Sequence, residues 1–272
     1  MGCAQKVHYG QLRPMGSFPE KLEEVSGIAQ ASQGHYWVIQ DSGNEDEIHM
    51  VDSTAQLIKS LKIDNAKNQD WEELTMDLQG NLYIGDFGNN ANKRKDLTIY
   101  KVSAEQLQKE APRAEKIEFS YPRQKNFPPA KDSLYYDTEG FFHQGGHLYI
   151  FTKNRTRPYS GKTLIYRLDD RPGEQEATFL GSLFLCGDKD QCSVTAADIS
   201  PDGRTMALLG YGLLFIVRDF GLSDFSGAKI QTYDLRSRTQ LESVLFLDER
   251  TLVLADEQND RGGRKLYRFT ID

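Results

Sequence analysis

Carboxylates recur in short pairs at the start of apolar segments of this sequence. Asp70 and Glu72 are two residues apart in DWEELT, and Asp137 and Glu139 have the same spacing in DTEGFF. Crowded carboxylates raise one another's pKa unless a cation or a basic group neutralises them. Hard oxygen ligands suit calcium or magnesium, and no cluster of histidine and cysteine points to zinc. The candidate metal ligands of this kind are Glu24, Asp70, Glu72, Asp137, Glu139 and Glu242.

A second set of polar residues follows the next apolar segment along the chain. DSGN begins at Asp41 and DFGNN begins at Asp86, and the two stretches occupy equivalent positions. KNR and DE follow two later apolar segments in the same way. The basic residues of this set are suited to bind an anionic group beside a metal ion. The candidate ligand-binding residues are Asp41, Asn44, Asp86, Asn89, Asn90, Lys153, Arg155 and Glu257.

The elements that must position these residues form a repeat. Five aligned segments are EVSGIA, DWEELT, DTEGFF, TAADIS and QLESVL, which begin at Glu24, Asp70, Asp137, Thr195 and Gln240. Each is followed by a turn rich in glycine, aspartate or asparagine and by a more apolar second strand. Third strands follow in all five units and fourth strands in the first four. A repeat of about 40 to 50 residues with four strands per unit is typical of a β-propeller.

The sequence therefore predicts an all-β fold, a single propeller domain over residues 1–272 with five four-stranded blades. Six blades are the alternative if an irregular stretch hides another unit. The last unit has only three strands, so we expect the N-terminal segment 6–12 (KVHYGQL) to pair with residues 265–271 and close the ring. Residues 103–111 predict a short inserted helix, because Ser103 is a good N-cap and a glutamine follows three residues later.

Strand direction predicts that both polar sets gather at one end of the ring. Consecutive strands of a blade run antiparallel, so the start of each first strand and the end of each second strand meet at the same rim. Two interpretations of this acidic rim remain open. The rim binds a divalent cation, or each acid pins a neighbouring blade by a hydrogen bond, with Lys153 and Arg155 as counter-ions.

The motifs SGIA, DSGN, DWEEL, GNLYIGDFGNN and SPDG resemble bacterial propellers of the SdiA-regulated type. The likeness to the gluconolactonase, paraoxonase and NHL propeller group is more distant. This resemblance implies a propeller, often exported, with a calcium-type site at the channel mouth in the enzyme members. It also implies that Glu24 stands for the first-strand metal glutamate of the gluconolactonase group, and Asn44, Asn89 or Asn90 for its amide ligands. The chain lacks that group's Glu-Gly-Pro and the paired histidines of paraoxonases.

Other functions find little support in the sequence. The net charge of -7 disfavours a nucleic-acid partner. No apolar run is long enough to form a transmembrane segment. No signature of a serine hydrolase, a P-loop or a zinc protease occurs. His143 and His147 lie across a predicted hairpin turn at the far end of the ring, where we expect exposed surface residues and not ligands.

The three cysteines bear on the compartment. Cys186 and Cys192 bracket the polar stretch CGDKDQC and either form a small disulfide, which implies an oxidising compartment, or remain free thiols. Met1-Gly2-Cys3 looks like the end of a bacterial lipoprotein signal, so residues 1–5 are either the remnant of a lipid anchor at Cys3 or a flexible N-terminus. The expected location is the bacterial periplasm or the cell surface.

Two functions of different classes follow. The first is an exported, lipid-anchored propeller that binds a small-molecule or protein ligand at the acidic mouth, with calcium or magnesium as its cation. The second is a metal-dependent hydrolase of a lactone, ester or phosphoester. In that case Glu24, Asp70 and Asp137 hold the cation, a bound water attacks, and Lys153 or Arg155 steadies the developing charge.

Overall fold

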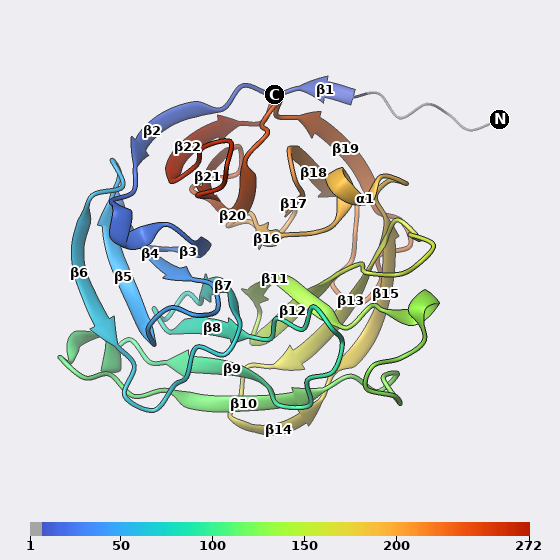
Figure 1. Ribbon diagram of the computed structural model, residues 1–272, viewed down its shortest axis with the longest axis horizontal. Coiled ribbons are helices and arrows are strands. Elements are labelled where there is room, and N and C mark those ends of the chain that lie inside the picture. Colours follow the sequence, from blue (N-terminus) through green and yellow to red (C-terminus); the bar gives the residue numbers. More distant parts are fainter. Residues whose placement is uncertain (1–6) are drawn as a thin grey trace.

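The computed structural model describes residues 7–272, whose strands form five sheets around a central axis (Figure 1). Each sheet is one blade of a propeller, so the prediction of five blades is confirmed and the six-blade alternative is wrong. The strands nearest the axis begin at the five predicted segments. They are β3 (Val25–Ser32), β7 (Trp71–Met76), β11 (Asp137–Gln144), β16 (Ala196–Ile199) and β20 (Gln240–Phe246).

The remaining strands of each blade follow outward in antiparallel order. The second strands are β4 (His35–Gln40), β8 (Leu82–Asp86), β12 (His147–Lys153), β17 (Met206–Leu209) and β21 (Thr251–Glu257). The third strands are β5 (Glu47–Asp52), β9 (Leu97–Val102), β13 (Lys162–Asp169), β18 (Leu213–Arg218) and β22 (Lys265–Thr270). The outer strands are β6 (Leu57–Lys62), β10 (Glu115–Ser120), β15 (Thr178–Phe184), β19 (Lys229–Asp234) and, in the fifth blade, β2 (Arg13–Ser17).

An N-terminal strand closes the ring, but it is not the predicted one. β2 pairs antiparallel with β22, from Arg13 opposite Arg268 to Ser17 opposite Lys265. The prediction of segment 6–12 as the closing strand was therefore wrong. Pro14 and Gly16 concealed β2 in the sequence. An edge strand tolerates proline, and Gly16 is required because an added Cβ would collide with the Thr54 carbonyl.

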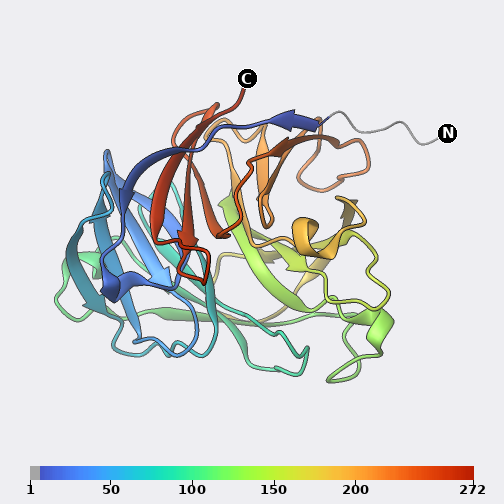
Figure 2. The same cartoon turned by 45° about the horizontal axis from the view of Figure 1, so that its top comes forward.

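Two extra strands cover the outer edges of two blades by parallel pairing. β1 (Val7–Tyr9), the described part of the predicted closing segment, pairs with β19 of the fourth blade. The N-terminal chain then crosses the top of the ring to reach β22 (Figure 2). β14 (Gly173–Glu176), from the third blade, pairs with β10 of the second. Covered edges limit pairing with other chains.

The core lies between neighbouring blades. Trp71 is fully buried and packs with Trp37 of the first blade and Ile84 of its own blade. Its indole nitrogen donates to the Lys67 carbonyl at 3.0 Å. Burying an aromatic ring of this size stabilises the contact between two blades and holds their inner strands at a fixed spacing around the axis.

Helical segments are short and lie in the connections. They are η1 (Glu20–Leu22), η2 (Gln106–Gln108), η3 (Lys131–Ser133) and α1 (Lys189–Cys192). The predicted helical insertion at 103–111 contains η2, whose Gln106 amide donates to the Ser103 hydroxyl at 3.2 Å. Within residues 7–272, none of these helices has the length and hydropathy required to cross a membrane.

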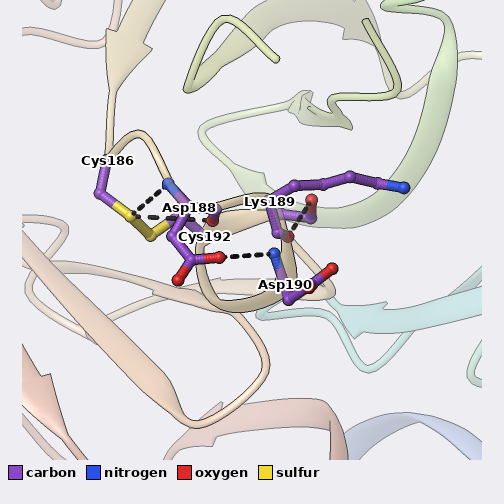
Figure 3. Close-up of a disulfide and its surroundings, with 6 residues drawn as sticks. Cys186, Asp188, Lys189, Asp190 and Cys192 are labelled. Carbon is purple, nitrogen blue, oxygen red and sulfur yellow. Dashed lines mark hydrogen bonds between the residues drawn. A yellow bond between two sulfur atoms is a disulfide. The ribbon is translucent and has the colours of Figure 1, made fainter. Parts of the chain in front are cut away.

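A disulfide closes the loop that contains α1 (Figure 3). Cys186 and Cys192 are bonded, with their Cα atoms 5.8 Å apart, so one of the two alternatives for this pair holds. Inside the loop the Asp188 carboxylate caps α1 by accepting from the Asp190 amide at 3.0 Å. Cys3, and with it the lipid-anchor prediction, lies outside the described residues.

Replacing both Cys186 and Cys192 by serine is expected to lower the free energy of unfolding by about 2 kcal/mol, because the open loop gains conformational entropy in the unfolded chain. Urea unfolding of the two proteins measures the difference. A reductant should shift the midpoint of the native chain and leave that of the double serine variant unchanged. Equal midpoints for both proteins without reductant would refute a stabilising role for the disulfide.

Candidate functional site

Bulges in the inner strands turn three glutamates toward one point at the channel mouth. The pairing of the first and second strands skips one residue in four blades, and in three of them the skipped residue is a glutamate. A bulge bends the strand and re-aims the side chain of the extra residue. One carboxylate oxygen from each of Glu72, Glu139 and Glu242 lies within 4.8 Å of the others. Three of the six candidate metal ligands therefore converge, each from a different blade.

Glu72 lacks any compensating partner. Only 4% of its surface is exposed, and its carboxylate accepts no hydrogen bond from any residue of the described chain, 7–272. Burial raises the pKa of Glu72 well above its usual value, and the charges of Glu139 and Asp41 raise it further. The carboxylate lies against Gly88, where a Cβ would collide with it. A buried carboxylate without a protein donor is costly unless a proton, a cation or water joins it.

A second acidic group shares Glu72. Oxygens of Asp41, Asp70 and Glu72 also lie within 4.8 Å of one another. Burial raises the pKa of Asp41 to about 6, the Ser42 backbone amide opposes the rise, and the charge of Asp70 adds to it. Burial also raises the pKa of Asp70, and the charge of Asp137 contributes. Glu72 thus joins two groups of carboxylates from the first, second, third and fifth blades.

Lys153 and Arg155 neutralise the third-blade side of this cluster. Lys153 Nζ lies 2.8 Å from Glu139 Oε1, and Arg155 Nε lies 2.6 Å from Asp137 Oδ2. A second nitrogen of Arg155 is 3.3 Å from Glu139 and also contacts Asn90. These contacts fit the interpretation of Lys153 and Arg155 as counter-ions. Neither cation forms an ion pair with Glu72, so the first-blade and second-blade side keeps its excess of negative charge.

Burial and neighbouring charges shift the pKa values of Glu139, Lys153 and Glu257. Burial raises the pKa of Glu139 to about 8, although the Lys153 ammonium opposes the rise. Burial alone would lower the pKa of Lys153, but the Glu139 carboxylate and Tyr211 outweigh it and hold that pKa well above its usual value. Burial also raises the pKa of Glu257 to about 8, and the charges of Glu242 and Asp41 contribute.

Several residues of the mouth were missed from the sequence. Tyr211 accepts from Lys153 Nζ at 3.0 Å and donates to Glu242 Oε1 at 3.2 Å. It lies in the β17–β18 loop, the fourth-blade equivalent of DSGN and DFGNN, and that position was the signal that could have found it. The side-chain nitrogen of Gln240 donates to Glu242 Oε1 at 3.4 Å and also to Glu257 Oε1. Below them Glu73 is fully buried and accepts from the Leu74 and Ile28 amides at 2.9 and 3.3 Å.

Other candidate residues serve the scaffold. Asp86 pairs with Arg94 at 3.0 Å and accepts from the Asp70 amide. The Asn89 amide donates to Asp137 Oδ1 at 2.7 Å, and the Asn89 side chain donates to the Tyr136 carbonyl. These contacts fit the alternative interpretation of the acidic rim, in which the polar residues hold the blades in place by hydrogen bonds.

Two further candidates lie outside the carboxylate groups. Glu24 is exposed and accepts from the Asn44 side chain at 2.6 Å. The structure brings neither Glu24 nor Asp137 into either group.

The prediction of exposed histidines on the far hairpin was wrong for one of them. The His143 side chain is only 9% exposed, and its Nε2 lies 2.9 Å from Asp170 Oδ2. His143 also stacks on the Tyr83 ring, with ring centroids 5.3 Å apart. The His147 side chain is 32% exposed and lies 3.4 Å from Asp169. The position of His143 in its hairpin gave no sign of its partner Asp170, which follows β13 in the same blade.

Without a bound cation, stability is expected to fall as the pH rises from about 6.5 to 8.5. The pKa is raised to about 8 for Glu139 and Glu257 and to about 7 for Asp198, mainly by burial. In this range the folded chain binds more protons than the unfolded chain, so the free energy of unfolding decreases with pH. Burial lowers the pKa of His49 from 6.5 to about 4, so its opposite contribution grows up to about pH 6.5 and levels off in the lower part of this window.

Calorimetric melting in chelator at several pH values measures this slope. A variant with Glu139→Gln and Glu257→Gln should show a shallower slope over the same range. A melting temperature that rises between pH 6.5 and 8.5 would contradict the assignment of raised pKa values.

Comparison with known proteins shows the fold and no more. No family model matches the sequence, and no curated protein does. The structure is similar to the PQQ-bound aldose sugar dehydrogenase of Streptomyces coelicolor, with a TM-score of 0.57 and 10% identity over 97% of this chain and 99% of that chain. It is also similar to YCF48 bound to D1 peptide, with a TM-score of 0.47 and 11% identity over 94% of this chain and 67% of that chain. The first likeness supports the β-propeller architecture.

Proposed function

We propose that the channel mouth binds calcium or magnesium and, through that cation, a small-molecule or protein ligand. One observation carries the proposal: Glu72, Glu139 and Glu242 meet from three blades, and the buried Glu72 carboxylate has no donor among the described residues. An all-oxygen donor set suits a hard cation. Asp41 and Asp70 add oxygens beside Glu72, where the charge of Arg94 offsets that of Asp70 in part.

The surroundings of the cluster favour a ligand that carries oxygen atoms. A cation held by three glutamates keeps coordination positions for further oxygens, since calcium takes six to eight of them. Lys153 and Arg155 lie on one side of the cluster, where a carboxylate or phosphate of the ligand would find a positive charge. The asymmetry of the mouth, basic toward the third blade and acidic toward the first and second, orients such a ligand.

We further propose that the protein is an exported lipoprotein of the SdiA-regulated type, in the bacterial periplasm or at the cell surface. The bonded pair Cys186 and Cys192 supports an oxidising compartment. The Gly-Cys sequence at residues 2 and 3 supports lipidation. Radiolabelled fatty acid incorporated into the native chain but not into a Cys3→Ser variant would test the anchor.

Calorimetric titration of the full chain with calcium and with magnesium tests the proposal. We expect binding of one ion or more per chain, which an excess of chelator reverses. A chain that binds neither ion, and whose melting temperature is the same with chelator and with calcium, would refute it.

A hydrolase is the second candidate, and one observation favours it. Glu139, within the carboxylate cluster, and Glu257, whose pKa the cluster's Glu242 helps to raise, have pKa values of about 8, close to the value that general acid or base catalysis requires at neutral pH. A screen of lactones, esters and phosphoesters in the presence of calcium distinguishes the two candidates. Turnover lost on removal of the cation supports the hydrolase, whereas cation binding without turnover supports the binding protein.

A further inference from the structure

A second group of potential metal ligands lies at the opposite end of the channel. One ligand atom each from Asp77, His143 and Asp170 lies within 4.8 Å of the others. Asp77 follows β7 in the second blade, whereas His143 belongs to β11 and Asp170 follows β13 in the third. An ion with bonds of about 2.1 Å holds its ligands about 3 to 4 Å apart, so these atoms need to move little to share one.

This group opens onto a cavity. The ends of the inner strands from all five blades surround a hollow of about 620 Å³, and Asp77, His143 and Asp170 all line it. Apolar side chains such as Leu74, Leu245 and Phe246 form much of the remaining wall. The group is therefore reachable from solvent, and an ion held there would face the cavity with its free coordination positions.

The positions of the three side chains are set by contacts outside the group. Asp77 Oδ1 accepts from the Gln79 and Asn81 amides at 2.9 and 2.8 Å, which fixes the carboxylate and leaves Oδ2 turned toward the group. The His143 ring stacks on Tyr83, and its backbone amide donates to the Thr75 hydroxyl at 3.1 Å. A pre-positioned donor set of this kind lowers the entropy cost of binding an ion.

The two carboxylates of the group share an outer partner. The Tyr83 hydroxyl lies 3.0 Å from Asp77 Oδ2 and 3.3 Å from Asp170 Oδ2. Asp77 Oδ2 also accepts from the Asn81 side chain at 2.7 Å. With a cation between Asp77 and Asp170, the Tyr83 hydroxyl and the Asn81 side chain would orient the carboxylates, as outer partners of metal ligands do.

We propose that Asp77, His143 and Asp170 form a second cation site, which takes zinc or a similar divalent transition metal and not calcium. The distinction follows from the donors, because an imidazole nitrogen suits transition metals whereas the mouth offers only oxygens. The sequence showed no cluster of histidine and cysteine for zinc, whereas the fold brings one histidine and two aspartates together. The proposal does not depend on the cation proposed at the channel mouth.

Metal binding at this group requires a change of tautomer at His143. Its Nε2 carries the hydrogen in the 2.9 Å contact with Asp170. When Nε2 becomes the ligand, the neutral ring carries that hydrogen on Nδ1 instead, so no net proton is released. Lys101 is the competing cation, since its Nζ lies 4.0 Å from Asp170 Oδ2 and donates to the Asp170 carbonyl at 3.0 Å.

Titration of the full chain, free of any histidine tag, with zinc in the presence of saturating calcium tests the site. We expect one zinc per chain, and we expect cobalt added in its place to give a visible absorption band from nitrogen and oxygen ligands. His143→Gln should weaken zinc binding at least tenfold and remove the cobalt band. His147→Gln is the matched control, because it removes a more exposed histidine of the same hairpin that also faces an aspartate, and it should bind zinc as the native chain does.

The failure of this site and the failure of the channel mouth are distinguishable. Glu72→Gln should leave zinc binding unchanged, whichever way it affects calcium. If His143→Gln unfolds, Asp170→Asn provides the second variant, and it too should weaken zinc at least tenfold at an unchanged melting temperature. A native chain that binds no zinc, or equal zinc binding by the His143→Gln and His147→Gln variants, would overturn the proposal.

Discussion

Glutamine in place of Glu72 is expected to raise the melting temperature of the chain in chelator at pH 8 and to abolish its rise with calcium. The native carboxylate is buried beside other acids without a donor, so the neutral amide removes an unfavourable charge. The same substitution removes the carboxylate shared by both acidic groups. Stability and cation binding should therefore change in opposite directions.

The size of the calcium effect follows from mass action. An ion at 100 times its dissociation constant stabilises the folded chain by about 2.7 kcal/mol. For a chain of this length that shift corresponds to a rise of about 5 to 10 °C in the melting temperature. Calorimetric scans of the native chain and of Glu72→Gln, each with calcium and with chelator, measure the four values required.

A matched variant separates this effect from a general change in charge. Glu45 lies in the β4–β5 loop with its side chain 77% exposed, and its nearest basic group is Lys62 at 3.9 Å. Glu45→Gln removes the same charge from an exposed position, so it should keep the calcium response and leave the melting temperature in chelator nearly unchanged. An undiminished calcium response in Glu72→Gln would place any bound ion elsewhere.

The repeat in the sequence was sufficient to predict the blades, because each inner strand begins at a recognisable polar position and each hairpin has turn residues. The aligned segments also place Glu72, Glu139 and Glu242 at equivalent positions. The sequence alone could not predict the bulges that turn these side chains toward one another, since a bulge depends on pairing with the second strand. Nor could it separate them from Glu24 and Asp137, whose partners Asn44 and Arg155 come from other connections.

Glu73 shows why the centre of the ring could not be predicted from one blade at a time. The equivalent positions in the first and third blades are Gly27 and Gly140, where a Cβ would lie 2.6 Å from the Leu74 nitrogen and 2.7 Å from the Ala196 carbonyl carbon. The inner strands approach too closely there for most side chains. Glu73 extends from the second blade to the Ile28 amide of the first, so its carboxylate links the inner strands of two blades.

Methionine in place of Lys153 is expected to destabilise the chain by about 3 to 5 kcal/mol at pH 9, because it leaves the Glu139 carboxylate buried without its partner at 2.8 Å. The loss should be smaller at pH 6.5. The pKa of Glu139 is about 8 even with the ammonium beside it, so this group is protonated at the lower pH and requires no counter-ion. Urea unfolding at the two pH values measures the difference.

Two further variants identify the cause of that loss. Lys162→Met, at an exposed lysine of β13 in the same blade, should change stability little at either pH. The double variant with Lys153→Met and Glu139→Gln should recover most of the stability, since the amide carries no charge; the non-additivity of the two substitutions measures their coupling. An equal loss at pH 6.5 and pH 9 would attribute the effect to packing and not to the buried charge.

Calcium should restore stability to the Lys153→Met variant more than it stabilises the native chain. Lys153 and a cation at the mouth compete for Glu139, because the ammonium occupies one of the three carboxylates that would hold the ion. Removing the lysine leaves Glu139 with the longer contact to Arg155 at 3.3 Å, so a divalent cation would neutralise more of the negative charge of the group at high pH. A calcium response in Lys153→Met that is no larger than in the native chain would mean that the ammonium and the cation do not share this site.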